Sequence, residues 1–284
     1  MRKQRNVQKN RKRILERGCY LSDDRITHSN MATDPRRNII VDDKHQILYC
    51  FVPKIACTSW KIVFLQLSGI VPPGRTPSQY YVNRHGLKKL RLLREYDLQQ
   101  RRYILGHYRK FLFTRNPYTR LLSVYRNKLE PESTFERAQK WQDTVGKVIT
   151  DKYGPKKKTA ATSSVPGQNA TLTFTKFLRY IIDDTSAVDD NRHWRSVYDS
   201  CFPCDVNYDF IGRFETLHSD VAYFLNLLGV EGKVEFPKAE MSSPTNSSNT
   251  AVLRKYYSKV PPILMKKLYA KYRLDFHLFG YREM

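Results

Sequence analysis

The chain has 284 residues, of which 40% are apolar, so it is long enough for one large or two small domains with a sizeable core. Its 50 lysines and arginines against 27 aspartates and glutamates give a formal net charge of +23, which favours a polyanionic partner such as nucleic acid, an anionic membrane or an acidic polysaccharide. No apolar run reaches the roughly 18 residues needed to span a bilayer and no signal peptide is visible, so the sequence as it stands predicts a soluble chain.

Residues 1–38 are polar and basic, and we expect them to form a stem or arm, with a short helix over residues 11–21, ahead of a folded domain at residues 39–284. Eight lysines and arginines stand against Glu16 alone in the first 17 residues. Most of the net positive charge lies beyond this segment, which predicts a basic folded surface. Neither a zinc spacing nor an aromatic ribonucleoprotein motif is present, so binding of nucleic acid is supported by charge alone.

The folded part begins with two predicted strands, "NIIVDD" at 38–43 and "HQILYCFV" at 45–52, which a short polar turn joins. The uninterrupted apolar run of the second strand indicates burial on both faces, as in a parallel sheet. After a short loop, apolar residues at helical spacing predict a helix with Thr58 or Ser59 as its N-cap and Gly69 as its C-terminal stop.

A second unit of the same kind follows in "RKFLFTRNPYTRLLSVYRNKL", residues 109–129. Residues 111–114 predict a short strand, and Pro117 suits the first turn of a helix. Apolar side chains at helical spacing predict the buried stripe of that helix, namely Leu121, Leu122, Val124, Tyr125 and Leu129. Two strand-loop-helix units in one chain predict an α/β fold with a central, mostly parallel sheet flanked by helices.

The remaining segments alternate between helical patterns and polar stretches. We expect a surface loop at 154–170, a helix at 174–184, a strand at 208–214, a helix at 216–228, an irregular segment at 231–249, and a closing helix with an aromatic tail at 261–281.

Both strand-loop-helix units place a cation where the strand ends, Lys54 in the first and Arg115 in the second. The N-terminus of the following helix offers amide groups and the positive end of the helix dipole, which together bind anions. The first loop lacks the GxxxxGK[ST] pattern of ATPases, and an ordinary strand-to-helix turn with an exposed lysine explains that loop equally well on spacing alone. Because ligands gather at the carboxyl ends of parallel strands, the two units together predict one ligand with two anionic groups.

The two loops carry a family resemblance. "VPKIACTSWK" and "RNPYTRLLSVYRNK" resemble the 5′-phosphosulfate and 3′-phosphate loops of the Golgi carbohydrate sulfotransferases, in the branch of chondroitin and dermatan 4-O-, N-acetylgalactosamine 4-O- and HNK-1 sulfotransferases. "RKRILERGC", "IIVDDKHQILYC", "HWRSVYDSCFPC", "YDFIGRFETL" and "LYAKYRLDFHLFGY" are similar to the same branch. The matches stand in one order over most of residues 11–281, which makes the resemblance highly specific.

The resemblance implies a sulfotransferase fold, 3′-phosphoadenosine 5′-phosphosulfate (PAPS) as the sulfate donor and no metal. Lys54 would neutralise the departing charge, while Arg115 and Ser123 would hold the 3′-phosphate. The alternative for the Ser123 hydroxyl is a bond to the Thr119 carbonyl within the helix. The implied donor-binding residues are Pro53, Lys54, Ile55, Ala56, Cys57, Thr58, Ser59, Arg115, Asn116, Pro117, Tyr118, Thr119, Arg120, Leu121, Leu122 and Ser123.

Two features depart from the family. Asn116 stands where the family usually has Asp or Glu, so an ion pair that would orient Arg115 is not predicted. The signal-anchor helix that the family carries ahead of its stem is also missing, so membrane attachment would need an anchor that this sequence does not contain.

Transfer also needs a base for the sugar hydroxyl, and histidine suits that role near neutral pH. His107 and His193 are the candidates, with Asp42 or Asp43 as alternatives. A lone histidine is more often structural than catalytic.

The five cysteines leave at least one unpaired, and "CFPC" at 201–204 is compatible with a zinc half-site, a redox pair or two separate disulfides. The lumenal setting that the resemblance implies favours structural disulfides, with Cys57 free and the pairing of the other four open. Asn169 and Asn246 head glycosylation sequons, which matter only in the secretory pathway.

These observations predict a Golgi-lumenal enzyme that moves a sulfuryl group from PAPS to the 4-hydroxyl of N-acetylgalactosamine in chondroitin or dermatan chains. An HNK-1-type enzyme acting on terminal glucuronic acid is the alternative within the family. From a different class, the alternative is a non-catalytic polyanion-binding protein. A sulfatable glycan is the expected partner, and nucleic acid is not expected.

Overall fold

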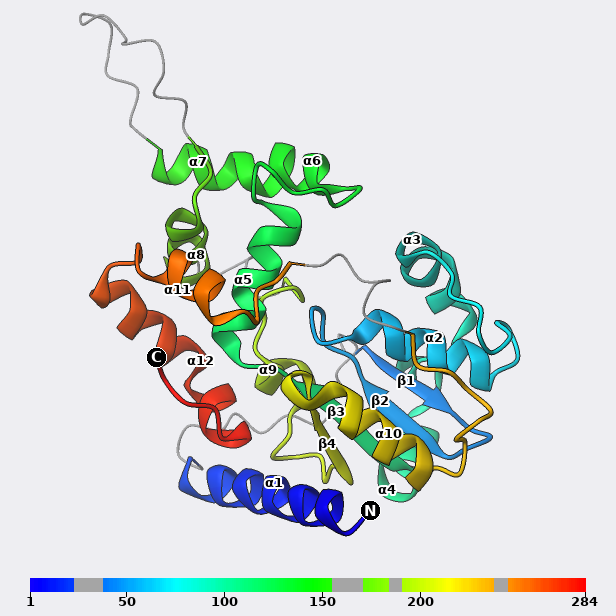
Figure 1. The fold of residues 1–284 in the computed structure, drawn as a ribbon. Helices are drawn as coiled ribbons and strands as arrows, with labels where there is room; N and C mark the ends of the chain where they lie inside the picture. Colours follow the sequence, from blue (N-terminus) through cyan, green and yellow to red (C-terminus); the bar gives the residue numbers. More distant parts are fainter. Residues whose placement is uncertain (23–37, 155–170, 184–190, 238–244) are drawn as a thin grey trace, which may run out of the picture. The chain divides into compact units, whose positions relative to one another are not determined.

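A computed structural model describes residues 1–22, 38–154, 171–183, 191–237 and 245–284 (Figure 1). The chain forms two compact units. Unit 1 comprises Met1–Pro117, Arg195–Ser242 and Tyr272–Met284, and unit 2 comprises Tyr118–Trp194 and Ser243–Lys271. The predicted loop at 154–170 and its sequon Asn169 lie almost entirely outside the described residues.

Unit 1 is built on a four-stranded sheet in the order β1-β2-β3-β4. Its strands are β1 (Ile39–Asp42), β2 (Ile47–Cys50), β3 (Arg109–Thr114) and β4 (Phe210–Arg213). β1 and β2 pair in an antiparallel hairpin, whereas β2 pairs with β3 and β3 with β4 in parallel. The predicted mostly parallel sheet is therefore confirmed, and the carboxyl ends of β2, β3 and β4 lie at one edge.

Unit 1 also contains several helices. They are α2 (Cys57–Leu67), α3 (Gln79–Tyr81), which continues into a π turn over Val82–Gly86, α4 (Leu98–His107), α9 (Val197–Cys201) and α10 (Leu217–Leu227). Aromatic rings fill the space between helices and sheet: Trp60 of α2 lies 4.9 Å from Phe111, and Phe224 of α10 lies 4.4 Å from the same ring. This burial is the main stabilising contribution because aromatic side chains remove the most apolar area from water.

Gly212 in β4 shows how closely this core is packed. A Cβ atom at this position would come within 2.2 Å of the Phe113 ring, so no larger residue fits without a shift of the strand.

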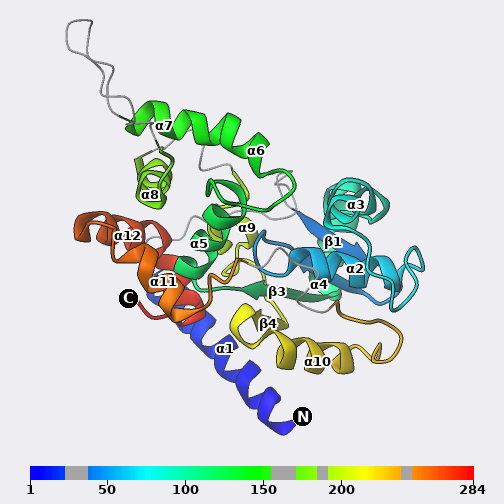
Figure 2. The same ribbon diagram turned by 45° about the horizontal axis from the view of Figure 1, so that its top comes forward.

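The N-terminal helix α1 (Arg2–Leu21) extends well beyond the short helix expected at residues 11–21. Figures 1 and 2 both show it beside β4 and α10, as part of unit 1. Gln8 and Arg11, both buried, reach the Ile211 carbonyl oxygen of β4 at 3.2 and 2.8 Å. The helix is longer than predicted because these tertiary contacts stabilise residues whose local pattern is only weakly helical.

Unit 2 is helical among its described residues. Its helices are α5 (Pro117–Lys128), which starts at the last residue of unit 1, α6 (Ala138–Trp141), α7 (Lys147–Tyr153), α8 (Phe174–Asp183), α11 (Thr250–Tyr257) and α12 (Pro262–Phe279), whose final residues belong to unit 1. The predicted stripe of α5 is fully buried. Helix α11 was not predicted; its start depends on the Asn249 side chain, which accepts hydrogen bonds from the amides of Ala251 and Val252.

Candidate anion-binding site

The loop between β2 and α2 has an unusual backbone. Lys54 and Ala56 both adopt left-handed conformations, with φ of 68° and 54°, which cost about 1–3 kcal/mol each in residues other than glycine. The side chain between them, Ile55, is fully buried and anchors the loop in the core. Such turns direct successive amide groups toward one point, as in known anion-binding loops.

Helix α2 begins directly after this turn. Ala56 is its N-cap and supplies no side-chain hydrogen bond, although sequence analysis had expected a Thr58 or Ser59 cap. The expectation was wrong because the left-handed turn starts the helix at Cys57, earlier than the pattern indicated. An uncapped N-terminus leaves first-turn amides and the positive end of the helix dipole available for an anion.

Arg115 connects the two loops at this edge of the sheet. It follows β3, is 4% exposed, and donates a hydrogen bond from Nη1 to the Lys54 carbonyl oxygen at 2.9 Å. Its guanidinium lies over the Phe214 ring, 3.9 Å from the ring centre. Because β2 and β3 are parallel neighbours, the loops that follow them begin at the same edge of the sheet, and the Arg115 guanidinium contacts the backbone of the Lys54 turn there.

A carboxylate from elsewhere in the chain, Glu215, contacts the backbone at position 116, where the family usually has an acidic residue. The backbone amide of Asn116 donates to Glu215 Oε1 at 2.8 Å, and Tyr281 donates to the other oxygen of Glu215 at 3.0 Å. Burial is the main cause that raises the pKa of Tyr281 well above its ordinary value, and the negative charge of Glu215 raises it further. The phenol therefore keeps its proton. Phe214, Glu215 and Tyr281 were not predicted at this site, because nothing near Arg115 in the sequence indicates them.

The rest of the predicted second loop belongs to unit 2. Arg120 is buried and directs Nη2 toward the carbonyl oxygens of Arg192 and His193, at 3.5 and 3.4 Å. Ser123 Oγ lies 3.0 Å from Thr245 Oγ1, so the hydroxyl pairs with another segment and not with the Thr119 carbonyl. The side chains of Tyr118, Leu121 and Leu122 are buried in the packing of this unit.

The four candidate bases occupy different places. His107 ends α4 just before β3, where it is exposed and its ring stacks on Tyr103 at 4.2 Å. Asp42 ends β1 and Asp43 follows it; Asp42 contacts His45, and Asp43 accepts from Tyr96 and Tyr108. Asp42 pairs with the first residue of β2, so these residues lie at the amino ends of the parallel strands, opposite the end that leads into the Lys54 turn and separated from it by the length of β2, about 10 Å at 3.3 Å per residue.

His193 lies in unit 2. Its ring packs edge-on against Trp141 at 5.0 Å, and its backbone amide donates to Asn191 Oδ1 at 3.0 Å. The side chain is partly buried.

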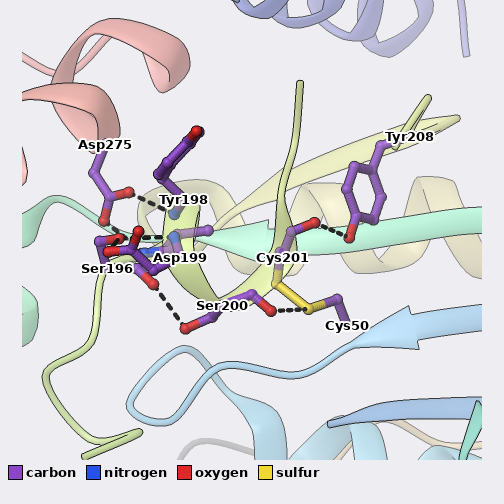
Figure 3. Close-up of a disulfide and its surroundings, with 9 residues drawn as sticks. Cys50, Ser196, Tyr198, Asp199, Ser200, Cys201, Tyr208 and Asp275 are labelled. Carbon is purple, nitrogen blue, oxygen red and sulfur yellow. Dashed lines mark hydrogen bonds between the residues drawn. A yellow bond between two sulfur atoms is a disulfide. The ribbon is translucent and has the colours of Figure 1, made fainter. Parts of the chain in front are cut away.

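Two disulfides, Cys19–Cys204 and Cys50–Cys201, confirm that the "CFPC" cysteines are structural, and Cys57 is free. Figure 3 shows Cys50–Cys201, which ties the end of β2 to α9, whose first amides donate to Asp275 at 2.8 Å. The disulfide thus holds the strand that leads into the Lys54 turn.

Within the described ranges, no three His, Cys, Asp or Glu residues are placed to hold a metal, and no helix there is long and apolar enough to cross a membrane.

Comparison with known proteins agrees with this geometry. Residues 37–282 match the sulfotransferase family. Carbohydrate sulfotransferase 11 of Rattus norvegicus is 33% identical over 250 residues, which cover 86% of this chain and 67% of that protein. Carbohydrate sulfotransferase 14 of Danio rerio is 35% identical over 97% of this chain and 71% of its own length, and carbohydrate sulfotransferase 9 of Homo sapiens is 32% identical over 98% and 61%. No solved structure matches the chain.

Proposed function

Since the chain belongs to the sulfotransferase family and is a sulfotransferase that modifies carbohydrate, we propose that it transfers a sulfuryl group from PAPS to the 4-hydroxyl of N-acetylgalactosamine in chondroitin or dermatan. The resemblance of its loops to that branch supports the acceptor. The net charge of +23 also fits a polyanionic acceptor, because a basic surface steers such chains toward the enzyme.

The observation that carries the proposed donor site is the hydrogen bond from Arg115 to the Lys54 carbonyl oxygen. It holds the Arg115 guanidinium against the backbone of the Lys54 turn, which leads into an uncapped helix N-terminus, and this combination fits a donor with anionic groups at both ends. PAPS, when bound, supplies the sulfuryl group. We assign its phosphosulfate to residues 53–59 and its 3′-phosphate to Arg115 and Ser123, with the remaining residues of 116–122 as support.

Lys54 is assigned the main electrostatic role. During transfer the bond from sulfur to the phosphate oxygen breaks, a new bond forms to the sugar oxygen, and negative charge grows on the phosphate. A cation fixed by a rigid turn stabilises that charge without reorganising, which is the largest contribution in reactions of this kind. The anchored backbone around buried Ile55 supports this role.

For the base that accepts the proton of the sugar hydroxyl, we favour His193 over His107. His107 lies at the amino end of β3, away from the Lys54 edge. The motif "HWRSVYDSCFPC", which contains His193, is part of the family resemblance. Asp42 and Asp43 are disfavoured by the same position at the amino ends of the strands.

A Golgi-lumenal location is part of the proposal. The two disulfides support an oxidising compartment, where such bonds persist. The sequon at Asn246 is exposed and in a turn, so its side chain is accessible for glycosylation in that compartment.

Incubation of the purified chain with labelled PAPS and an acceptor panel tests the function. The panel contains desulfated chondroitin, desulfated dermatan, a glycan ending in glucuronic acid, and no acceptor. Label on the 4-hydroxyl of N-acetylgalactosamine is the expected result. Label on terminal glucuronic acid would assign the HNK-1-type acceptor instead, and retention on immobilised 3′-phosphoadenosine 5′-phosphate (PAP) without any labelled product would overturn both acceptors.

A further inference from the structure

Asn83, in the π turn after α3, makes three side-chain hydrogen bonds, two of them to the helix that follows the Lys54 turn. Its Oδ1 accepts from Lys61 Nζ at 2.7 Å, and its Nδ2 donates to the Gln79 carbonyl oxygen at 2.9 Å and to Thr58 Oγ1 at 3.2 Å. Thr58 and Lys61 lie on the first turns of α2. The side chain therefore bridges two elements at the candidate anion site.

The orientation of this amide is fixed by its neighbours. The Lys61 ammonium can only donate and the Gln79 carbonyl can only accept, so the oxygen must face Lys61 and the nitrogen must face Gln79. The second hydrogen on the same nitrogen then points to Thr58, whose hydroxyl oxygen has to accept it.

This arrangement determines where the Thr58 hydroxyl hydrogen can point. Among the described residues, the Thr58 hydroxyl makes one hydrogen bond, in which its oxygen accepts from Asn83 Nδ2. The hydroxyl hydrogen is consequently available for a further partner. Thr58 is half-buried on the first turn of α2, where the helix dipole favours a negatively charged partner.

Close packing holds the turn against α2. A Cβ atom on Gly86 would come within 2.8 Å of a Leu65 methyl group, and Val82 is fully buried. Asn83 lies in the same turn and contacts α2 through Thr58 and Lys61. The amide is thus held in place before any ligand binds.

We propose that Asn83 is a positioning residue for the sulfate donor. Its amide donates to a lone pair of the Thr58 hydroxyl and thereby turns the hydroxyl hydrogen toward an anionic oxygen bound at residues 53–59. The inference rests on the proposed donor site. It predicts that Asn83 acts only through Thr58.

A double-mutant cycle on PAP binding, measured by calorimetry with the full chain, tests this. Asn83→Ala should weaken PAP binding about tenfold when Thr58 is present and less than twofold in the Thr58→Val background. The KM for PAPS should rise with Asn83→Ala, while kcat and the KM for the glycan stay unchanged. Asn226→Ala is the matched control, because Asn226 is also an exposed helical asparagine bonded to a side chain, Glu231.

Asn83→Asp provides a second variant of nearly the same size. Its carboxylate would accept the Thr58 hydroxyl hydrogen and turn it toward residue 83, away from the bound anion. PAP binding should therefore fall further than with Asn83→Ala. PAP affinity equal to wild type in Asn83→Asp would overturn the inference.

The remaining outcomes separate the inference from the proposed function. A wild-type chain that does not bind PAP would remove the donor site and the inference together. If the wild type binds PAP, three results would leave the donor site standing and refute the role of Asn83. They are no effect of Asn83→Ala on PAP affinity, the same effect of Asn83→Ala with and without Thr58, and no effect of Thr58→Val.

Discussion

Arg11 of helix α1 offers a stringent test of how the N-terminal segment contributes to stability. Its guanidinium donates to the Ile211 carbonyl oxygen at 2.8 Å, to Asp220 Oδ2 at 2.8 Å and to Thr216 Oγ1 at 2.9 Å. Arg11 is 7% exposed and Asp220 is fully buried. Replacing Arg11 with Met keeps most of the side-chain volume and removes the charge.

The expected cost is large because the partner charge stays behind. Removing one member of a buried ion pair costs roughly 3–5 kcal/mol, since the remaining carboxylate is left without its counter-charge in a low-dielectric site. The Arg213 amide and the Thr216 hydroxyl still donate to Asp220, which places Arg11→Met near the lower end of that range. Against a total stability of about 5–15 kcal/mol, this loss is easily measured.

Urea unfolding of the oxidised chain provides the measurement. Arg13→Met is the control, because Arg13 is exposed and, among the residues that the structure describes, its side chain hydrogen-bonds only to Asn10, so its change should stay within about 0.5 kcal/mol. Arg11→Met combined with Asp220→Asn should recover part of the loss by removing the unpaired charge. If Arg11→Met is no more destabilising than Arg13→Met, the reasoning about the buried pair is refuted.

Further predictions concern the proposed active site. Lys54→Ala should abolish sulfuryl transfer while the melting temperature stays within a few degrees of wild type; undiminished activity would exclude its assigned role. Arg115→Ala should raise the Kd for PAP at least tenfold, from the lost charged hydrogen bond, and leave the KM for the glycan unchanged; an equal rise in both would contradict a donor-specific role. His193→Gln should lower kcat at least a hundredfold and His107→Gln less than twofold, and the reverse order in the labelled-PAPS assay would reassign the base. Glu215→Gln should weaken PAP binding less than Arg115→Ala does, because it perturbs the Asn116 amide and Tyr281 and keeps the Arg115 guanidinium; titration with PAP decides the order.

The core of the candidate site was predictable because its signals are local. An apolar run followed by Lys54, and another followed by Arg115 and Pro117, indicate two strands that lead into helices. Parallel pairing of β2 and β3 then brings the two cations to one edge, as expected. The N-cap of this helix was misjudged by two or three residues, because the left-handed conformation of Ala56 cannot be inferred from an alanine.

The support around those cations was not predictable. Glu215 accepts a hydrogen bond from the Asn116 backbone amide, and it reaches Asn116 from 99 residues away. Asn83 reaches Thr58 across 25 residues and gives no local signal of its own. Such partners depend on which elements pack together, and a side chain in a turn has the same local appearance whether or not it has a distant partner.

The sequence by itself determined the α/β class, the two strand-loop-helix units, the cations at their ends and the resemblance to carbohydrate sulfotransferases. Each of these depends on the spacing of residues within about 20 positions, which the periods of strands and helices record directly. The tertiary structure alone decided that helix α1 joins unit 1, through an Arg11–Asp220 pair 209 residues apart and a Cys19–Cys204 disulfide. It also decided that Cys50 pairs with Cys201, because pairing follows the distance between side chains in the folded chain and not their order in the sequence.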